Sequence, residues 1–236
     1  MRYVALDIET EPNESLIDEL PLPEIKLGNT RDEEKIEAKK AEAREAQLAR
    51  MALSPDFGRV ISIQYAYMNA GGELRAESVV RAPGVSEAEI RKYESELLQA
   101  AAELVSSAWQ KETCIATFNG AGFDVPFLTR RALHLGICFP KIPIRKYEVC
   151  KMQAARHVDL YRVIEENEPG NPLNLPRKLA WYAKIILGAH HPEAFQNKLA
   201  YKDWYRQGNI GALVEAGKWD AIQTLRLAEV FEAYYE

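Results

Sequence analysis

The 236-residue sequence has few cysteines and no long apolar run. Its three cysteines, Cys114, Cys138 and Cys150, show no Cys-x-x-Cys spacing. Such an odd and sparse set favours reduced thiols in a cytoplasmic protein and argues against a disulfide framework or a zinc site. No apolar run approaches the ~20 residues of a membrane span, and the N-terminal residues show no signal-peptide pattern. We therefore expect a cytoplasmic protein that does not associate with a membrane.

The sequence also lacks an excess of basic charge. A net charge of −5 argues against a protein that coats nucleic acid through a broad basic surface. It leaves room for an enzyme that acts on a nucleic-acid end, because metal ions held by carboxylates supply local positive charge. The apolar fraction of 47% is ordinary for a globular chain with a proper core.

Alternating strand and helix signals predict an α/β protein with a mixed sheet flanked by helices. Strands are expected at 2–9, 60–68, 74–80 and 114–118, and helices at about 86–109, 124–135, 176–187, 198–207 and 210–235. The polar stretch at about 30–53, rich in Ala, Glu, Lys and Arg, predicts a charged helical insertion after the first strand. It is either a solvated decoration or an arm that contacts a substrate or partner. We expect residues 1–236 to form a single domain.

The first strand carries two acids close together, Asp7 and Glu9. Because side chains alternate along a strand, these acids share one face, while Leu6 and Ile8 share the other and can enter a core. Two such carboxylates repel each other unless a cation lies between them, and oxygen ligands suit Mg²⁺ or Mn²⁺. A polar strand edge with two solvated acids would produce the same pattern.

A second acidic motif lies in the stretch Phe118-Asn-Gly-Ala-Gly-Phe-Asp124. A strand ends here, two glycines allow a tight turn, and Asp124 begins a helix. One interpretation is that Asn119 and Asp124 only cap the loop and the helix. The other is that Asp124 points to the same sheet edge as the first acidic pair, where open α/β sheets bind ligands.

Together the two motifs resemble the DEDD superfamily of 3′–5′ exonucleases, whose domains have a ribonuclease H-like fold. The pair Asp7 and Glu9 is similar to the first motif, and Asn119 followed five residues later by Asp124 is similar to the second. The resemblance is greatest to the exonuclease domain of family-B DNA polymerases and to stand-alone predicted exonucleases like it. It implies two-metal hydrolysis of phosphodiester bonds with Mg²⁺ or Mn²⁺, at the 3′ end of a nucleic acid, with single-stranded DNA as the expected substrate.

The superfamily has a further acid on a C-terminal helix, preceded by Tyr at four residues or His at five. Asp220 has this setting, but the two earlier positions hold Ala216 and Glu215. The resemblance thus leaves the group that orients the attacking water open. Glu215 could act as the base, or a neighbour such as Lys218 or Trp219, or a tyrosine from another segment, could replace it. The enzyme could also be slow or inactive.

The resemblance also implies roles for the acids. Asp7 would bridge two ions, Glu9 and Asp220 would hold the ion that activates water, and Asp124 would steady the second ion. Residues expected to bind the terminal nucleotide are Thr10, Phe118, Asn119 and Phe123, with core packing as the alternative for the two aromatic rings.

Other polar residues are given structural roles. Asp159 is the second candidate for the late acid, with a capping or supporting role as the main expectation, and His190-His191 is expected to form a loop. The alternative function is a catalytically impaired exonuclease fold that binds nucleic acid or serves as a scaffold. Ala216 favours this alternative, whereas the intact acids disfavour it.

Overall fold

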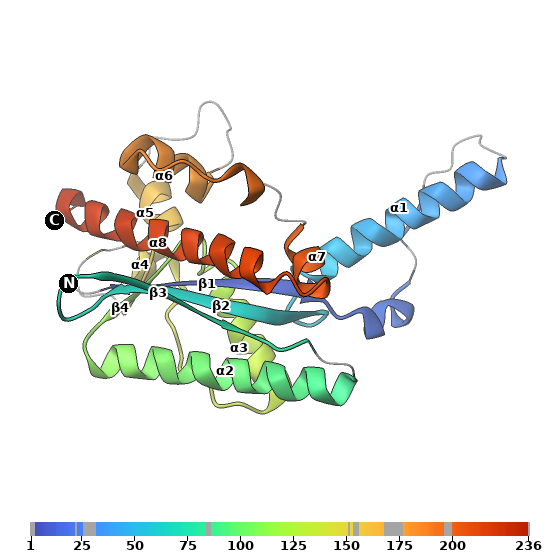
Figure 1. Cartoon of the computed structure of the whole chain (residues 1–236), viewed down its shortest axis with the longest axis horizontal. Helices are drawn as coiled ribbons and strands as arrows, with labels where there is room; N and C mark the ends of the chain where they lie inside the picture. Colours follow the sequence, from blue (N-terminus) through green and yellow to red (C-terminus); the bar gives the residue numbers. More distant parts are fainter. Residues whose placement is uncertain are drawn as a thin grey trace.

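The computed structural model describes residues 3–21, 23–25, 32–83, 86–150, 152, 156–167, 177–195 and 200–235. They form a five-stranded mixed sheet with strand order β3-β2-β1-β4-β5 and helices on both faces (Figure 1). The strands are β1 (Tyr3–Pro12), β2 (Gly58–Met68), β3 (Leu74–Val80), β4 (Cys114–Thr117) and β5 (His157–Asp159). The longer helices are α1 (Glu33–Met51), α2 (Glu87–Gln110), α3 (Asp124–Leu135) and α8 (Ile210–Tyr235). The predicted α/β class is confirmed.

Shorter helical segments connect these elements. They are η1 (Glu14–Glu19), α4 (Lys146–Val149), α5 (Leu160–Asn167), α6 (Leu179–Leu187), η2 (Glu193–Phe195) and α7 (Ala200–Arg206). Helix α8 lies along one face of the sheet, and α2 and α3 cover the opposite face (Figure 1). Within the described parts of the chain, we find no helix with both the length and the apolar character needed to cross a membrane.

Strand β1 is central and divides the core. It pairs antiparallel with β2 and parallel with β4. Leu6 and Ile8 are buried with residues of α2 and α3, whereas Tyr3 and Ala5 are buried with residues of α8. The predicted alternation along this strand is therefore confirmed. Because Asp7 continues the Tyr3 and Ala5 series, its side chain is directed to the α8 side of the sheet.

The region after β4 differs most from the expected set of elements. That set contains no strand at 157–159 and no helix at 160–167, where the structure has β5 and α5. Strand β5 has only three residues, too few for a hydrophobic period to be read. Its conformation is set by parallel pairing with β4, in which His157 lies beside Ile115 and Asp159 lies beside Thr117.

The charged insertion is a helix that projects away from the sheet (Figure 1). Helix α1 is shorter than the predicted stretch of 30–53, and the Asp32 side chain caps it by accepting hydrogen bonds from the N–H groups of Glu34 and Lys35. Its only buried residue within the described helix is Met51, at the end that meets the body of the protein. The insertion leaves and re-enters the sheet at adjacent points, because Pro12 pairs with Gly58.

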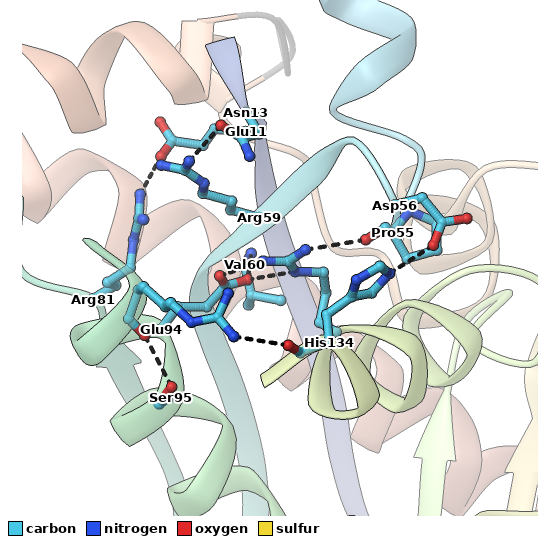
Figure 2. A network of polar contacts seen from close by, with 12 residues as sticks. Glu11, Asn13, Pro55, Asp56, Arg59, Val60, Arg81, Glu94, Ser95 and His134 are labelled. Atoms are coloured by element: carbon cyan, nitrogen blue, oxygen red, sulfur yellow. Dashed lines mark hydrogen bonds and ion pairs between the residues drawn. The ribbon is translucent and has the colours of Figure 1, made fainter. Parts of the chain in front are cut away.

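A polar network holds the end of β1 to its neighbours (Figure 2). Arg81, which follows β3, forms a buried ion pair with Glu11, and Arg59 donates a hydrogen bond to the side chain of Asn13. Glu94 of α2 accepts a hydrogen bond from the Val60 N–H at 2.9 Å. These contacts bind β1, β2 and α2 together near the end of β1, and such buried charges are tolerated because each has a partner.

Candidate functional site

A cavity of about 1090 Å³ lies beside the second half of β1. Its walls come from segments far apart in the sequence: β1, the end of α1, the 118–124 segment, α6, the loop before η2, α7 and α8. All four acids predicted as metal ligands border it, as do the four residues predicted to bind a nucleotide: Asp7, Glu9, Asp124, Asp220, Thr10, Phe118, Asn119 and Phe123.

Three of the acids converge in this cavity. Ligand oxygens of Asp7, Glu9 and Asp220 lie within 4.8 Å of one another. The first two come from one face of β1, and Asp220, only 4% exposed, comes from α8, which packs on that face. Carboxylates this close repel one another unless a cation lies between them. The oxygen-only donor set and its spacing fit a hard divalent cation, which takes oxygen ligands at roughly 2.0–2.6 Å.

Asp124 borders the same cavity from the start of α3, but it lies outside the three-acid cluster. The residue that caps α3 is Phe123, so helix capping does not explain the position of the Asp124 carboxylate. Its Oδ1 atom instead accepts a hydrogen bond from the backbone N–H of Ile8 at 3.1 Å. The start of α3 is thereby attached to β1 between the two acids of the first motif.

Asp159 shapes the loop that joins β4 to α3. Its fully buried carboxylate accepts hydrogen bonds from the N–H groups of Asn119 at 2.8 Å, Ala121 at 3.0 Å and Tyr161 at 3.1 Å. Asn119 has a φ of 67°, in the left-handed region that few residues other than glycine adopt. The carboxylate therefore stabilises an uncommon backbone turn at the wall of the cavity, which fits the supporting role expected for Asp159.

A buried histidine, His157, precedes Asp159 on β5. The Nδ1 atom of His157 lies 2.6 Å from the Pro143 carbonyl, and its Nε2 atom lies 2.8 Å from the Thr117 hydroxyl. Because a carbonyl only accepts, Nδ1 carries the proton and Nε2 accepts from the hydroxyl. Burial lowers the pKa of His157, which favours this neutral form. His157 therefore joins the end of β4 to the segment between α3 and α4.

Phe118 and Phe123, the two aromatic residues predicted to bind a nucleotide, pack against core residues and also border the cavity. Phe118 packs against Tyr161 and Tyr182, with ring centroids 6.1 and 6.0 Å away. Phe123 packs against Phe127 at 5.5 Å. Each ring is therefore held in place by its neighbours while it borders the cavity.

Thr10 also has a structural partner at the cavity. Its hydroxyl donates a hydrogen bond to the Ala52 carbonyl at 2.7 Å. Since Ala52 follows the last residue of α1, this contact connects β1 to the base of the projecting helix.

The structure does not bring Glu215 to the acids. Glu215 is exposed on α8 and is not one of the described residues that border the cavity. Ala216 is completely buried, beneath Tyr201 and Tyr205 of α7. The placement of Glu215 therefore gives no support to the expectation that it acts as a base.

Several residues at the rim of the cavity were not expected from the sequence. They are basic or aromatic: Arg50, Tyr161, Arg177, Lys178, Trp181, Lys184, His190, His191 and Tyr201. The sequence of α6, Leu-Ala-Trp-Tyr-Ala-Lys-Ile-Ile-Leu, is typical of a core helix, yet Trp181 is 51% exposed. The two histidines do lie in a loop, as expected, and the His191 ring packs edge-on against Trp219 at 4.5 Å.

The sequence profile of the RNase_H superfamily matches residues 78–235, more than half of the chain. The match begins after β1, so Asp7 and Glu9 lie outside it. No curated protein matches the chain by sequence. The ribonuclease H-like fold predicted from the two acidic motifs is confirmed.

Two solved structures are similar to the chain in fold. The family B DNA polymerase from the hyperthermophilic archaeon Pyrobaculum calidifontis superposes with a TM-score of 0.60 and 18% identity, over 99% of this chain and 25% of that chain. E. coli exonuclease I, solved in complex with a dT13 oligonucleotide, superposes with a TM-score of 0.45 and 13% identity, over 98% of this chain and 41% of that chain. The chain thus spans 25% of the polymerase and shares its fold over that part, in agreement with the predicted resemblance.

Proposed function

The chain belongs to the RNase_H superfamily, and on that premise we propose that it is a metal-dependent 3′–5′ exonuclease acting on single-stranded DNA. One observation carries the proposal: oxygens of Asp7, Glu9 and Asp220 lie within 4.8 Å of one another in a cavity with a basic and aromatic rim. A binding module alone has no reason to present these acids to a polyanion unless cations neutralise them.

We assign the acids the roles that two Mg²⁺ or Mn²⁺ ions would require. Asp7 would be shared by both ions, Glu9 and Asp220 would hold the first, and Asp124 would contribute to the second. The ions, when bound, lower the pKa of the attacking water and stabilise the charge on the phosphate. Water would attack phosphorus, the bond to the 3′ oxygen would break, and a nucleoside 5′-monophosphate would leave.

The basic and aromatic residues around the cavity favour a single-stranded substrate. Lys184 of α6 and Lys178, the residue that caps this helix, border the cavity on either side of Trp181 in the sequence, and Arg177 precedes Lys178. Basic side chains that follow the backbone and exposed rings on which bases stack are the combination that binds single strands without sequence preference. Stacking on Trp181 requires a base that is free of its complement, which favours a single strand over a duplex.

A second candidate function is favoured by one observation. Position 216, where DEDD exonucleases usually have a tyrosine, is occupied by a buried alanine, and Glu215 is exposed. A protein of this kind could bind metal and nucleic acid without turnover. The two functions differ in whether the bound strand is shortened.

The test is digestion of 5′-labelled single-stranded DNA and RNA with Mn²⁺, Mg²⁺ or EDTA. We expect a metal-dependent ladder that shortens from the 3′ end of DNA and is absent in Asp7→Asn. Asp203→Asn is the matched control, because Asp203 is an exposed acid on α7 outside the described wall of the cavity. Mn²⁺ binding without shortening would support the binding function instead. Absence of both Mn²⁺ binding and shortening would exclude both proposals.

A further inference from the structure

Helix α8 carries an alanine, with a side chain of one methyl group, one turn before Asp220. Ala216 lies four residues before Asp220, so both project from the same face of the helix. Ala216 is nevertheless completely buried, because it forms a cluster with Ile61, Leu213 and two tyrosines of α7. The space above Ala216 is therefore filled by rings that come from another helix.

The two tyrosines differ in their access to the acids. Tyr201, only 2% exposed, borders the cavity together with the three-acid cluster, and its hydroxyl donates a hydrogen bond to the Phe195 carbonyl at 3.1 Å. Tyr205 is equally buried, but it is not among the described residues of the cavity wall. The Tyr205 ring faces the Arg81 guanidinium at 5.3 Å instead.

We propose that Tyr201 supplies, from α7, the phenol that positions the attacking water in place of the side chain missing at Ala216. A phenol oxygen both donates and accepts hydrogen bonds. With its proton directed to the Phe195 carbonyl, the oxygen of Tyr201 accepts a hydrogen bond from water and directs the oxygen of that water toward phosphorus. Tyr201 acts here as a positioning residue, and this inference rests on the proposed exonuclease function.

The ring surroundings of Tyr201 suit such a role. Tyr201 stacks on Trp204, with centroids 5.1 Å apart and planes 22° apart, and Trp204 packs against Phe195 at 6.2 Å. Both ends of the Tyr201 side chain are thus fixed, the ring by Trp204 and the hydroxyl by the Phe195 carbonyl. A group that orients water is effective only when it is held in one geometry.

The first test removes only the hydroxyl. Tyr201→Phe keeps the ring, and Tyr205→Phe makes the same change on the neighbouring tyrosine as a matched control. We expect Tyr201→Phe to lower kcat about 10²-fold, the cost of losing the correct placement of a reacting group. KM for the oligonucleotide and the Mn²⁺ dissociation constant, measured by calorimetry, should stay within about threefold. Tyr205→Phe should leave all three quantities near their wild-type values.

The second test moves the phenol between the two helices. Tyr201→Ala should lose kcat, and adding Ala216→Tyr should restore at least about tenfold of that loss, because the ring then fills the same space from α8. Water-proton relaxation of bound Mn²⁺ gives a readout independent of turnover. It should change in Tyr201→Phe and return toward the wild-type value in the double variant.

The results separate this inference from the function on which it rests. If wild-type protein shortens DNA and Tyr201→Phe behaves like Tyr205→Phe, the role of Tyr201 is wrong and the exonuclease function stands. An equal fall of kcat and Mn²⁺ affinity in Tyr201→Phe, or no recovery in the double variant, would reduce Tyr201 to a packing residue. If wild-type protein shortens no DNA, the proposed function fails, and the inference fails with it.

Discussion

The Asp124 carboxylate accepts a hydrogen bond from the backbone N–H of Ile8 at 3.1 Å. Ile8 lies between Asp7 and Glu9, and its side chain is buried on the opposite face of β1. One short contact therefore sets the start of α3 relative to both acids of the first motif. Any change at Asp124 has a structural effect and an electrostatic effect, and two variants can separate them.

Asp124→Asn keeps an oxygen that can accept from the Ile8 N–H but removes the negative charge. We expect its urea unfolding to match the wild-type protein within about 0.5 kcal/mol, with loss of nuclease activity. Asp124→Ala removes the acceptor as well and should cost about 1–3 kcal/mol of stability, since the Ile8 N–H is buried. Equal stability of the two variants would contradict a structural role for this hydrogen bond.

Asp159→Asn tests how the loop before α3 is held. Both oxygens of Asp159 accept from backbone N–H groups, so an amide nitrogen in either position would face a donor. The expected loss is about 1–3 kcal/mol of unfolding free energy, accompanied by weaker oligonucleotide binding. Asp203→Asn, on an exposed helix position, should change stability by less than about 0.5 kcal/mol. A similar small change in Asp159→Asn would show that the loop does not depend on this carboxylate.

Arg131→Met tests the buried ion pair with Glu94. Arg131 donates to both oxygens of Glu94, at 2.9 and 2.7 Å, and Glu94 is 1% exposed. Removing the cation leaves a buried carboxylate, which should lower the free energy of unfolding by about 3–5 kcal/mol in urea titrations. Glu37→Gln breaks an exposed pair with Lys40 and should cost at most about 0.5 kcal/mol. A loss below about 1 kcal/mol in Arg131→Met would refute the importance of the pair.

Trp181→Ala tests the rim as a binding surface. With Ca²⁺ in place of Mg²⁺, anisotropy of a labelled DNA strand measures binding by itself. Stacking contributes about 1–3 kcal/mol per base, so the dissociation constant should rise about tenfold or more. Tyr234→Ala removes an aromatic ring that is 82% exposed at the end of α8 and should leave affinity unchanged. Equal affinities for the two variants would remove Trp181 from the binding surface.

Cys114 predicts a pH dependence of stability. Burial raises the pKa of the Cys114 thiol from its ordinary value of 9.0 to about 12. The native state therefore keeps its proton where the unfolded chain loses it, so the contribution is complete below pH 9 and is lost as pH rises toward 12. Between pH 8 and pH 10, wild-type stability should fall by about 1.4 kcal/mol more than that of Cys114→Ala. Cys138→Ala, at an exposed thiol, should follow the wild-type protein.

The positions of the two acids on β1 were predictable because they follow from the alternation of side chains along a strand, which is a local pattern. Alternation along one strand is enough to place Asp7 and Glu9 opposite Leu6 and Ile8, and both the sheet and the two core layers agree with it. The setting of Asp220 on a long helix was also readable, because the helix spans 26 residues without proline. Strand alternation and an uninterrupted helical stretch can be recognised from the sequence whichever neighbouring elements bury their apolar faces.

The remaining wall of the cavity depends on packing between distant segments. The exposure of Trp181 is decided by where α6 lies, since its own sequence is as apolar as that of a core helix. Tyr201 meets Ala216 only because α7 packs against α8. Neither contact has a periodic signature, so the resemblance could point to position 216 as a departure from the expected tyrosine but could not point to Tyr201, which we propose in its place.

The pairing of Pro12 with Gly58 makes the insertion a separable appendage. The chain departs and returns on one rung of the β1–β2 ladder, and the Asn13 N–H donates to the Phe57 carbonyl at 2.7 Å directly beyond it. Because the cost of closing a loop grows slowly with its length, residues can be added to or removed from the outer turns of α1 with little effect on the sheet. The length of the projecting helix can therefore vary independently of the arrangement of the acids on β1 and α8.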